Sequence, residues 1–499
     1  MLVRSPSSLR TAGSGRTRPA TSDTSRRPGA ERRTAAVTPS LDDVPSVLWF
    51  RRDLRRHDNP ALLAALDAAL ADGDDDVVPL FVLDPRLWEP AGEVRRAYLL
   101  RSLRSLDASL GGRLLVRHGD PRRVVPDVAA LAGAGTVHVA ADFGPYGSAR
   151  DVDVDAALAA AGRSLVATGS PYAVAPGRVR KSDGTAYRVY TPYYRAWLVH
   201  GWRSPAPDPG SWPSWTRGGA TSDPLPDEPD LGRLTLPPVG EEAALDRWDD
   251  FRERGLDSYG EQRDRPDLAS TSGLSAHLRW GEVHPRTLLA ALGDTASHEV
   301  FRKELAWREF YADVLHHEPA SARTWLDPRF ARMRHDDGPD ADARFTAWTQ
   351  GRTGYPFVDA GMRQLLAEGW VHNRVRMVVA SFLVKDLHLP WQRGAAWFMR
   401  HLRDGDLASN QQGWQWVAGS GTDAAPYFRI FNPVAQGVRF DPDGDYVRRF
   451  VPELRGIGGS DVHEPWKAPL LAPDYPERVV DHAAERESAL ARYAEVSGR

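Results

Sequence analysis

The sequence predicts two folded parts joined by a long linker: an α/β domain on a parallel five-stranded sheet, then an all-helical domain. In residues 46–175, short apolar runs alternate with helical segments, which is typical of a parallel sheet covered by helices on both faces. In residues 241–499, apolar residues recur at intervals of three and four, which indicates packed helices. The stretch 176–240 has little apolar periodicity and many Pro and Gly after residue 203, so we expect a linker on the surface.

Composition sets limits on the class of protein. The 499 residues are enough to bury two hydrophobic cores. Lys and Arg number 64 against 67 acidic residues, so no global positive charge indicates nucleic acid, although a neutral protein can carry a local basic groove. Cysteine is absent, which excludes disulfides and thiolate metal sites and fits a reducing compartment. No apolar run approaches the ~20 residues that span a bilayer, so we expect no membrane contact. We also expect no metal centre.

The first residues differ from the rest. Residues 1–45 hold eight arginines among many Ser, Thr, Pro and Ala, a composition too polar to fold, so we expect a disordered extension. Arginine-rich leaders of this kind also resemble organelle transit peptides.

The strands of the first part are expected at its five apolar runs, 46–50, 77–84, 113–119, 136–142 and 164–169. Helices are expected over 59–70 and 96–110, and Asp53 and Asn59 are candidate caps for the first of them. The sheet is Rossmann-like, but no G-x-G-x-x-G motif follows its first strand, so the dinucleotide-binding mechanism has no support. The four arginines within 49–62 fit a solvated loop as well as a ligand site. In the second part, helices are expected over 241–256, 299–317, 357–369 and 370–387.

The stretch 404–433 is the densest in ligand-binding groups. Asp404 and Asp406 stand two residues apart and do not share a helical face, so we expect a turn that presents both carboxylates. Amides and the indoles of Trp414 and Trp416 follow. This mixture suits a large heteroaromatic ligand with many polar edges. A tryptophan-rich core beside a capped turn is the alternative interpretation.

The stretch DGDLASNQQGWQW (404–416), together with TGYPFVDAGMRQLLAEGWVHNRVRMVVASFLVKDL (353–387), resembles the flavin domain of the DNA photolyase/cryptochrome family. It is most similar to microbial class I cyclobutane pyrimidine dimer photolyases, and the match runs from about Val47 to past Trp466. The resemblance implies an antenna-binding α/β domain over 46–175, an interdomain linker over 176–240 and a helical, FAD-binding catalytic domain over 241–499.

The resemblance implies a flavin-phosphate segment. Tyr259 and the run Thr271, Ser272, Gly273, Leu274 and Ser275 match the family's tyrosine and its T-S-R-L-S motif, where hydroxyl and N–H groups at a helix start bind phosphate. Taken alone, the run is also a common helix-capping cluster. Relatives usually carry a base where Gly273 stands, so we expect one charge contact to the pyrophosphate to be missing.

The resemblance also assigns the groups around the flavin ring. Asp404 and Asp406 are expected at the isoalloxazine edge, with Arg376 holding Asp404. Asn410 is expected to face flavin N5, where its neutral amide is photolyase-like; plant-type cryptochromes are expected to have Asp there and animal ones Cys. The other implied cofactor-binding residues are Phe301, Arg308 and Gly405.

The implied substrate pocket begins on one predicted helix. Glu304 and Trp307 lie three apart and share a helical face. In the family, the carboxylic group bonds the edges of a flipped-out pyrimidine pair and the indole stacks on it. Asn373 and Met377 complete the matched pocket, and with Asn410 these are the expected catalytic residues. Relatives that repair (6-4) photoproducts have a histidine where Asn373 stands, which favours the dimer as substrate.

Basic residues surround these positions and are expected to neutralise DNA phosphates. They are Arg263, Arg302, Lys303, Arg308, Arg374, Arg429 and Arg439, and Gln436 matches a further family DNA contact.

Tryptophans imply an electron-transfer chain that photoreduces the flavin. Trp414 and Trp391 match its first two members. The third should fall between Trp325 and Trp348, where the sequence has no Trp and His335 or Gly338 occupies the place. Either another Trp or Tyr ends the chain, or photoreduction is slow.

The α/β domain of relatives can hold an antenna chromophore. Folate-binding relatives have an Asn-Glu pair where Tyr146 and Gly147 stand, ahead of Ala149, Arg150 and Asp151. The missing carboxylate favours 8-hydroxy-deazaflavin, or an empty site, over methenyltetrahydrofolate.

The resemblance therefore implies a light-dependent repair enzyme of the deoxyribodipyrimidine photo-lyase type, a carbon–carbon lyase. Photoexcited FADH⁻ passes an electron to the dimer, the cyclobutane ring splits, and the electron returns. The alternatives are a cryptochrome-type blue-light receptor and a (6-4) photolyase, and a dark flavin oxidoreductase lacks a nicotinamide fingerprint. The expected partner is UV-damaged DNA, bound by a monomer in a bacterial cytoplasm.

Overall fold

The computed structural model describes residues 45–73, 75–210, 213–423 and 429–497. The expected disordered extension, Pro45 excepted, lies outside these ranges. The strands of the sheet are all parallel, in the order β3-β2-β1-β4-β5. They are β1 (Ser46–Phe50), β2 (Asp76–Leu83), β3 (Leu115–His118), β4 (Thr136–Val139) and β5 (Ser164–Ala167). This confirms the predicted parallel five-stranded sheet.

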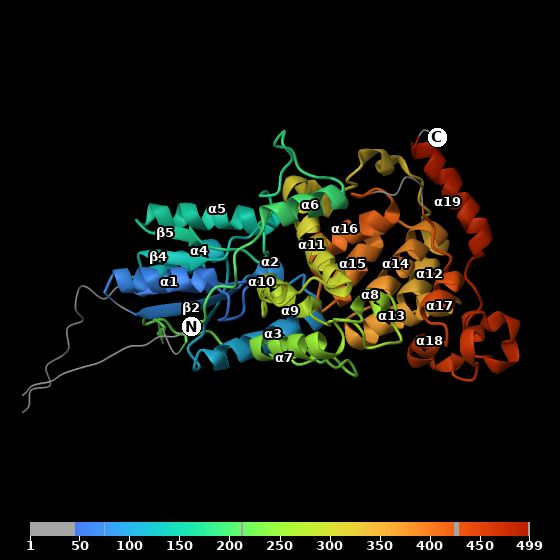
Figure 1. The fold of residues 1–499 in the computed structure, drawn as a ribbon, viewed down its shortest axis with the longest axis horizontal. Coiled ribbons are helices and arrows are strands. Elements are labelled where there is room, and N and C mark those ends of the chain that lie inside the picture. The colour runs from blue at the N-terminus through green and yellow to red at the C-terminus, as the bar shows by residue number, and fades with distance from the viewer. Residues whose placement is uncertain (1–44, 74, 211–212, 424–428, 498–499) are drawn as a thin grey trace, which may run out of the picture. The chain divides into compact units, whose positions relative to one another are not determined.

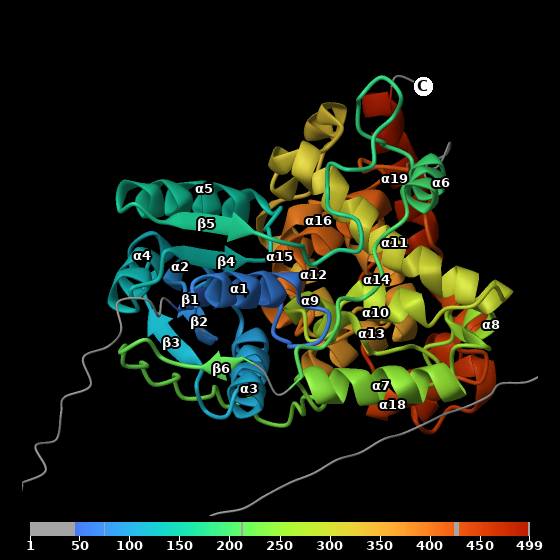
Figure 2. The ribbon, with the colours of Figure 1, turned by 60° about the vertical axis from the view of Figure 1, so that its left-hand side comes forward.

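The two faces of the sheet are covered by different helices (Figures 1 and 2). Leu48 and Phe50 of β1 pack into a core with α1 (Pro60–Ala71) and α3 (Glu93–Ser109). Val47 and Trp49, which point the other way, pack with α4 (Pro121–Leu131) and α5 (Pro145–Ala160). Asn59 caps α1 by accepting a hydrogen bond from Leu62 N at 3.2 Å, whereas Asp53 accepts from Arg51 N instead.

The linker contains regular structure that the sequence did not predict. A two-residue strand, β6 (Ser214–Trp215), pairs in parallel with the start of β2, and α6 (Tyr190–His200) lies earlier in the segment. Tyr193 and Trp197 of α6 are buried. Two residues are too few to show an alternating pattern, and aromatic residues dominate α6, so neither element gave a periodic signal.

The helices of the second part are α7 (Glu241–Arg254), α8 (Tyr259–Gln262), α9 (Ser275–Trp280), α10 (Pro285–Ala290), α11 (Ala296–His317), α12 (Gly338–Thr349), α13 (Pro356–Glu368), α14 (Asn373–Ser381), α15 (Trp391–His401), α16 (Leu407–Ala418), α17 (Pro433–Phe440), α18 (Asp445–Phe450) and α19 (His482–Ser497). They contribute to two large hydrophobic clusters, one with residues of α7 to α11 and the other with residues of α12 to α18. Within the described ranges, no helix is both long enough and apolar enough to cross a membrane.

One expected helix has different bounds. The helix expected over 370–387 starts three residues later, at Asn373, and its last part, Phe382–Asp386, is π-helical rather than α-helical. Gly369 ends α13 in the left-handed conformation, and His372 Nδ1 accepts from Arg374 N to cap α14.

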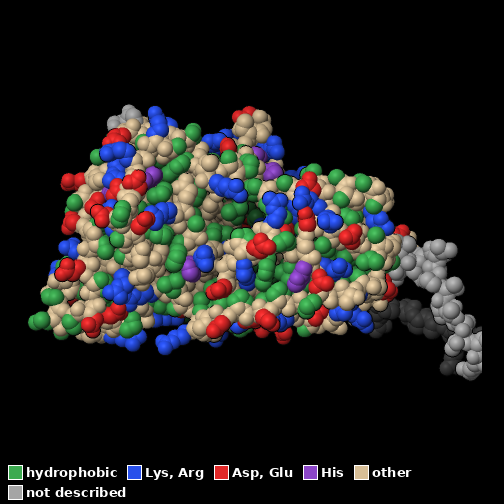
Figure 3. Space-filling model, turned by 180° about the vertical axis from the view of Figure 1, so that it is seen from behind, with side chains coloured by type: hydrophobic (Ala, Val, Ile, Leu, Met, Phe, Trp, Pro, Cys, Tyr) green, Lys and Arg blue, Asp and Glu red, His purple; other side chains and the backbone are tan. Residues whose placement is uncertain are grey.

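The face drawn in Figure 3 is hollowed near its centre, and Lys and Arg side chains border the hollow.

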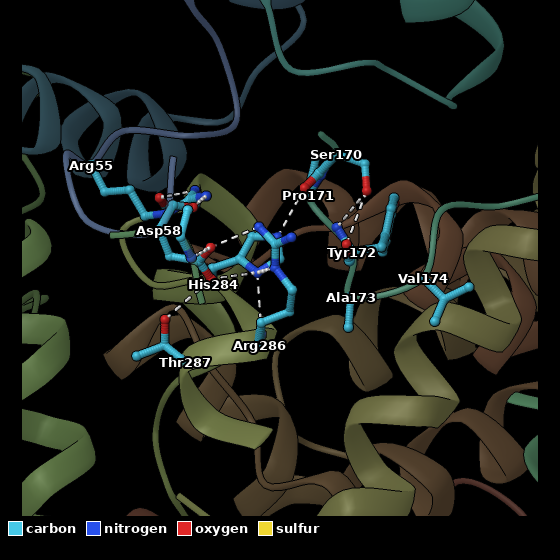
Figure 4. Close-up of polar contacts among 12 residues, drawn as sticks. Arg55, Asp58, Ser170, Pro171, Tyr172, Ala173, Val174, His284, Arg286 and Thr287 are labelled. Carbon is cyan, nitrogen blue, oxygen red and sulfur yellow. Dashed lines mark hydrogen bonds and ion pairs between the residues drawn. The ribbon is translucent and has the colours of Figure 1, made fainter. Parts of the chain in front are cut away.

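The α/β and helical parts meet at Asp58 (Figure 4). Its carboxylate accepts hydrogen bonds from Arg286 at 2.7 Å and from Ala206 N of the linker at 2.8 Å. His284 joins the same cluster and bonds Ser170 O through Nε2 at 2.9 Å. One loop of the α/β domain thereby holds both the linker and α10.

Candidate functional site

A cavity of about 520 Å³ opens among α8, α9, α11, α14 and α16, within the range of roughly 300–1,000 Å³ typical of ligand sites. Most of the predicted site residues lie in its wall. They are Tyr259, Arg263, Ser272, Ser275, Phe301, Glu304, Trp307, Arg308, Asn373, Arg374, Arg376, Met377, Asp404, Asp406, Asn410 and Trp414. The structure thus brings together residues that are up to 155 positions apart, since Tyr259 and Trp414 share one wall.

Other predicted residues lie beside or away from the wall. Thr271, Gly273 and Leu274 are neighbours of Ser272, and Gly405 stands between Asp404 and Asp406. The residues that the structure places away from the cavity are Trp391, Arg302, Lys303, Gln436, Arg429 and Arg439.

The turn before α16 presents both carboxylates, as predicted. Asp404 pairs with Arg376 at 2.8 Å, and only 3% of its side-chain surface is exposed. Asp406 is the N-cap of α16: it accepts from Ser409 N at 3.0 Å and pairs with Arg52 at 2.6 Å. Burial opposes ionisation of Asp406, but the guanidinium groups of Arg52, Arg308 and Arg279 outweigh it and lower the pKa. Asp406 therefore faces the cavity as an anion.

Unsatisfied polar atoms mark where a ligand would bond. Among the described residues, Asp404 Oδ1 and Arg279 NH1 are buried without a hydrogen-bond partner, and both residues line the cavity. Buried polar atoms are normally paired, so these two call for a ligand with a donor and an acceptor. Asn410 Nδ2 donates to Ala395 O at 3.1 Å and to Gln411 Oε1 at 2.8 Å, which fixes its amide at the wall. An unpaired carboxylate acceptor and an unpaired guanidinium donor in one wall fit the polar edge of a flavin.

A base that was not predicted packs against the segment before α9. Arg247 of α7 lies against Gly273, and a Cβ at Gly273 would stand 3.2 Å from Arg247 Nε. Its guanidinium donates to Ser272 O and Thr271 O, each at 2.7 Å. The base that relatives carry at position 273 thus has a counterpart in space, which braces the backbone of the segment.

The substrate residues share one side of the cavity. Glu304 of α11 pairs with Arg263 at 2.5 Å, and burial raises the pKa of its carboxyl group although Arg263 opposes the shift. Trp307 lies one turn further along the same helix. Asn373 begins α14, and Met377 follows one turn later. A carboxyl group beside an indole offers the edge and face contacts that an extruded base needs.

Sequence reasoning missed several wall residues. Tyr311 lines the cavity and was not named from the sequence, whereas Trp416, which also lines it, was named in the stretch 404–433 but given no role in the site. Arg52 comes from the α/β domain. The sequence of the loop around it fitted either a solvated loop or a ligand site. Arg52 bonds a cavity carboxylate, while Arg55 is buried and donates to Gly281 O at 3.0 Å, so this loop joins the two parts.

Tryptophans lead away from Trp414. Gly394 lies against the Trp414 ring, because a Cβ there would stand 2.2 Å from it, and Trp391 is one turn before Gly394 on α15. The ring centroids of Trp391 and Trp325 are 6.1 Å apart. His335, one of the two residues in the expected third place, stacks on Trp325 at 5.6 Å. Trp325 therefore stands next in line spatially, and its role stays a prediction.

The predicted DNA contacts fall in two groups. Arg263 and Arg374 line the cavity, and Gln436 is on α17. Arg308 instead donates to Pro171 O at 2.9 Å and Leu278 O at 3.0 Å, an interior position that fits the cofactor role better than a DNA contact. Arg302 is largely buried by its pairing with Glu299 at 2.5 Å.

Family models match both parts of the chain: DNA photolyase over residues 46–210, and the FAD-binding domain of DNA photolyase over residues 301–495. The chain is 41% identical to the deoxyribodipyrimidine photo-lyase of Agrobacterium fabrum, over 92% of this chain and 99% of that protein. It is 43% identical to the enzyme of the same name from Streptomyces griseus, over 88% and 97%.

Solved structures agree with the sequence relatives. A class III photolyase from Agrobacterium tumefaciens superposes with a TM-score of 0.82 and 39% identity, covering 93% of this chain and 100% of that one. A Synechocystis cryptochrome superposes with a TM-score of 0.81 and 27% identity, covering 89% and 99%. Because the solved relatives include a class III enzyme, the narrower class I assignment stays a prediction. The chain belongs to the DNA photolyase family, and its helical part is that family's FAD-binding domain.

Proposed function

We propose that this protein is a light-driven DNA repair enzyme that splits cyclobutane pyrimidine dimers. The observation that carries the proposal is the joint wall of the cavity. Asp404, Asp406 and Asn410 offer the contacts of a flavin ring, and Glu304 and Trp307 on α11 offer those of an extruded base pair. One cavity therefore has the groups to hold an electron donor and its acceptor together.

Reduced FAD, when bound, supplies the photoexcited electron that opens the cyclobutane ring. The chain supplies position and exclusion of water. Asp404 with Arg376, and Asp406 with Arg52, would hold the edge of the flavin ring, and the Asn410 amide would be the group that meets N5. Glu304, with its raised pKa, can donate to or accept from the base edges. Arg263 and Arg374, which line the same cavity, would neutralise phosphates.

A repair assay tests the proposal. Purified, reduced protein is illuminated with dimer-containing DNA, and the thymine absorbance near ~260 nm is expected to recover in light but not in darkness. DNA carrying (6-4) photoproducts is the matched control, and no recovery is expected there because Asn373 stands where (6-4) enzymes have a histidine. Retained FAD without recovery on the dimer substrate would contradict repair and support a sensor.

A cryptochrome-type receptor is the second candidate, since the Synechocystis cryptochrome has the same fold. The four substrate-side residues, Glu304, Trp307, Asn373 and Met377, favour repair, because a sensor needs no base-binding wall.

For the second chromophore, we propose 8-hydroxy-deazaflavin rather than methenyltetrahydrofolate. Where folate binders have an Asn-Glu pair, Gly147 takes the place of the carboxylate, and a Cβ there would stand 2.0 Å from Asp142 Oδ2. The neighbouring Tyr146 donates its hydroxyl to Asp84, at the carboxyl end of β2. Its ring lies beside Arg86 and Arg150. The site thus lacks a free acid for a pterin amine. We also propose that the enzyme acts as a monomer in the cytoplasm.

A further inference from the structure

The indole of Trp307 is covered on one side by a residue of the linker. Tyr190, the first residue of α6, stacks on Trp307 with ring centroids 3.7 Å apart and an angle of 8° between planes. Tyr190 is buried and Trp307 is in the cavity wall. Since one face of the indole is occupied by the phenol ring, the other face is the one left for a ligand.

A hydrogen bond fixes the Tyr190 ring along the stack. Its hydroxyl donates to Lys303 O at 2.8 Å. Lys303 O is also the carbonyl that an α-helix pairs with the N–H of Trp307, four residues on. The phenol is therefore tied to the same helical turn that carries the indole, and the indole also contacts Phe310 edge-on and Tyr311 at a tilt.

The backbone of Tyr190 is held in turn by Asp423. The cap position of α6, Val189, makes no side-chain capping bond. Asp423 replaces it: its carboxylate accepts from Tyr190 N at 3.1 Å, and its own N–H donates to Arg188 O at 3.0 Å. A carboxylate at a helix N-terminus is favourable.

Asp423 adopts a left-handed conformation with φ of 54°, which is uncommon outside glycine and marks a position that the surroundings enforce. It follows α16, the helix that carries Asn410 and Trp414 on the flavin side. The contact thus links the end of the flavin helix to the residue behind the substrate indole.

We propose that Tyr190 and Asp423 form a support that presets the plane of Trp307, and so strengthens the preference for DNA with an extruded pyrimidine pair over undamaged DNA. Tyr190 is a positioning residue, because it acts through Trp307 and lies outside the cavity wall. The inference rests on the proposed stacking role of Trp307. An indole that is already fixed loses little rotational freedom when a base stacks on it, so binding costs less entropy than it would with a mobile indole.

Binding in the dark tests the support. Tyr190→Leu removes the ring, Tyr190→Phe keeps it, and both are compared as FAD-loaded protein with a dimer-containing oligonucleotide and its undamaged twin. We expect Tyr190→Leu to weaken dimer binding about 3- to 10-fold, the range of one aromatic pair, with undamaged DNA unaffected. Tyr190→Phe should stay within about 2-fold of the natural protein, since the stack remains. Tyr194→Leu is the control for the loss of an aromatic ring from α6, because Tyr194 stacks on Tyr190 and Trp197 in the same helix. It should leave the preference for dimer-containing DNA unchanged.

A spectroscopic measurement and variants of Asp423 distinguish loss of the support from a general loss of structure. The near-ultraviolet circular dichroism of the Tyr190–Trp307 stack should change in Tyr190→Leu and in Asp423→Ala, but not in Asp423→Asn, which keeps a capping oxygen. If Tyr190→Leu loses FAD, Asp423→Ala decides: unchanged preference overturns the proposal. Unchanged preference in a folded Tyr190→Leu does the same.

Trp307→Ala distinguishes a failure of the proposed stacking role of Trp307 from a failure of the proposed support by Tyr190 and Asp423. If it leaves the preference intact, the stacking role of Trp307 fails. If it abolishes the preference while Tyr190→Leu and Asp423→Ala do not, only the support is wrong.

Discussion

At the scale of single residues, the two carboxylates before α16 differ in how many partners share each charge. Asp404 Oδ2 has Arg376 at 2.8 Å, and its other oxygen has no protein partner among the described residues. Asp406 has Arg52 at 2.6 Å, the Ser409 N–H at 3.0 Å and two further guanidinium groups nearby. Asp404 thus has one ion pair and one further guanidinium nearby, that of Arg403, whereas the charge of Asp406 is shared by more partners.

This difference predicts unequal costs for two matched variants. Arg376→Ala should lower the free energy of unfolding by about 3 kcal/mol, because it leaves a buried carboxylate unpaired. Arg52→Ala should cost about 1–2 kcal/mol less, since Arg279 and Arg308 still face Asp406. Urea unfolding of the FAD-free proteins measures both. Equal losses would mean that the two anions are stabilised alike.

Residue-level reasoning from sequence reached the groups that lie in motifs. Asp404, Asp406, Glu304 and Trp307 were predictable because spacing and motif identify them, and the structure places all four in one wall. Arg52 and Arg247 were not, since each reaches the site from a different segment, and only the fold brings an arginine of the α/β domain to Asp406.

At the scale of elements, α14 depends on the protonation state of its cap. His372 Nδ1 accepts from Arg374 N at 3.2 Å, so this nitrogen must be unprotonated. Burial lowers the pKa of His372 to about 4, from an ordinary value near ~6.5. The folded protein thus resists a proton that the unfolded chain takes up between these values.

The sign of the pH effect follows from that difference. Stability from neutral His372 is fully present above about pH 6.5 and declines as the pH falls toward 4, by at most about 1.4 kcal/mol per pH unit. His372→Asn keeps a capping oxygen and cannot titrate. The advantage of the natural protein over this variant should shrink as urea unfolding is repeated at pH 7, 6 and 5. A constant difference would show that His372 does not carry the proton.

Elements differed in how far the sequence predicted them. Strands β1, β2 and β4 were predictable because buried parallel strands are nearly continuous apolar runs, as SVLWF in β1 illustrates with every residue buried. Strand β6 and helix α6 were missed because one has two residues and the other is packed mainly by aromatic rings. The start of α14 was missed because a histidine cap has no strong sequence signal.

At the scale of the whole molecule, the two predicted parts share packing. Ala276 and Trp280 of α9 belong to the same hydrophobic cluster as Leu48 and Phe50 of β1. Leu54 N donates to Trp280 O at 3.2 Å, and the described chain from residue 45 onward lies within one compact unit. We therefore expect the α/β and helical parts to unfold together.

Gly281 is one of the tight points of this contact. It has φ of 70°, and a Cβ would stand 1.9 Å from Arg52 O. Gly133 provides a control, because it has the same φ of 70° and open space around a Cβ. Gly133→Ala should cost about 1 kcal/mol for the left-handed backbone alone. Gly281→Ala should cost about 2–4 kcal/mol, since backbone carbonyls must also move apart.

Urea unfolding followed by far-ultraviolet circular dichroism and by tryptophan fluorescence separates shared from independent folding. If the parts share one core, the two signals should coincide in every variant, and Gly281→Ala should shift both to lower urea. It should also weaken FAD binding, because the displaced Arg52 is the partner of Asp406. Two separate transitions, or equal losses for Gly281→Ala and Gly133→Ala, would show that the contact between the parts adds nothing to the stability of either.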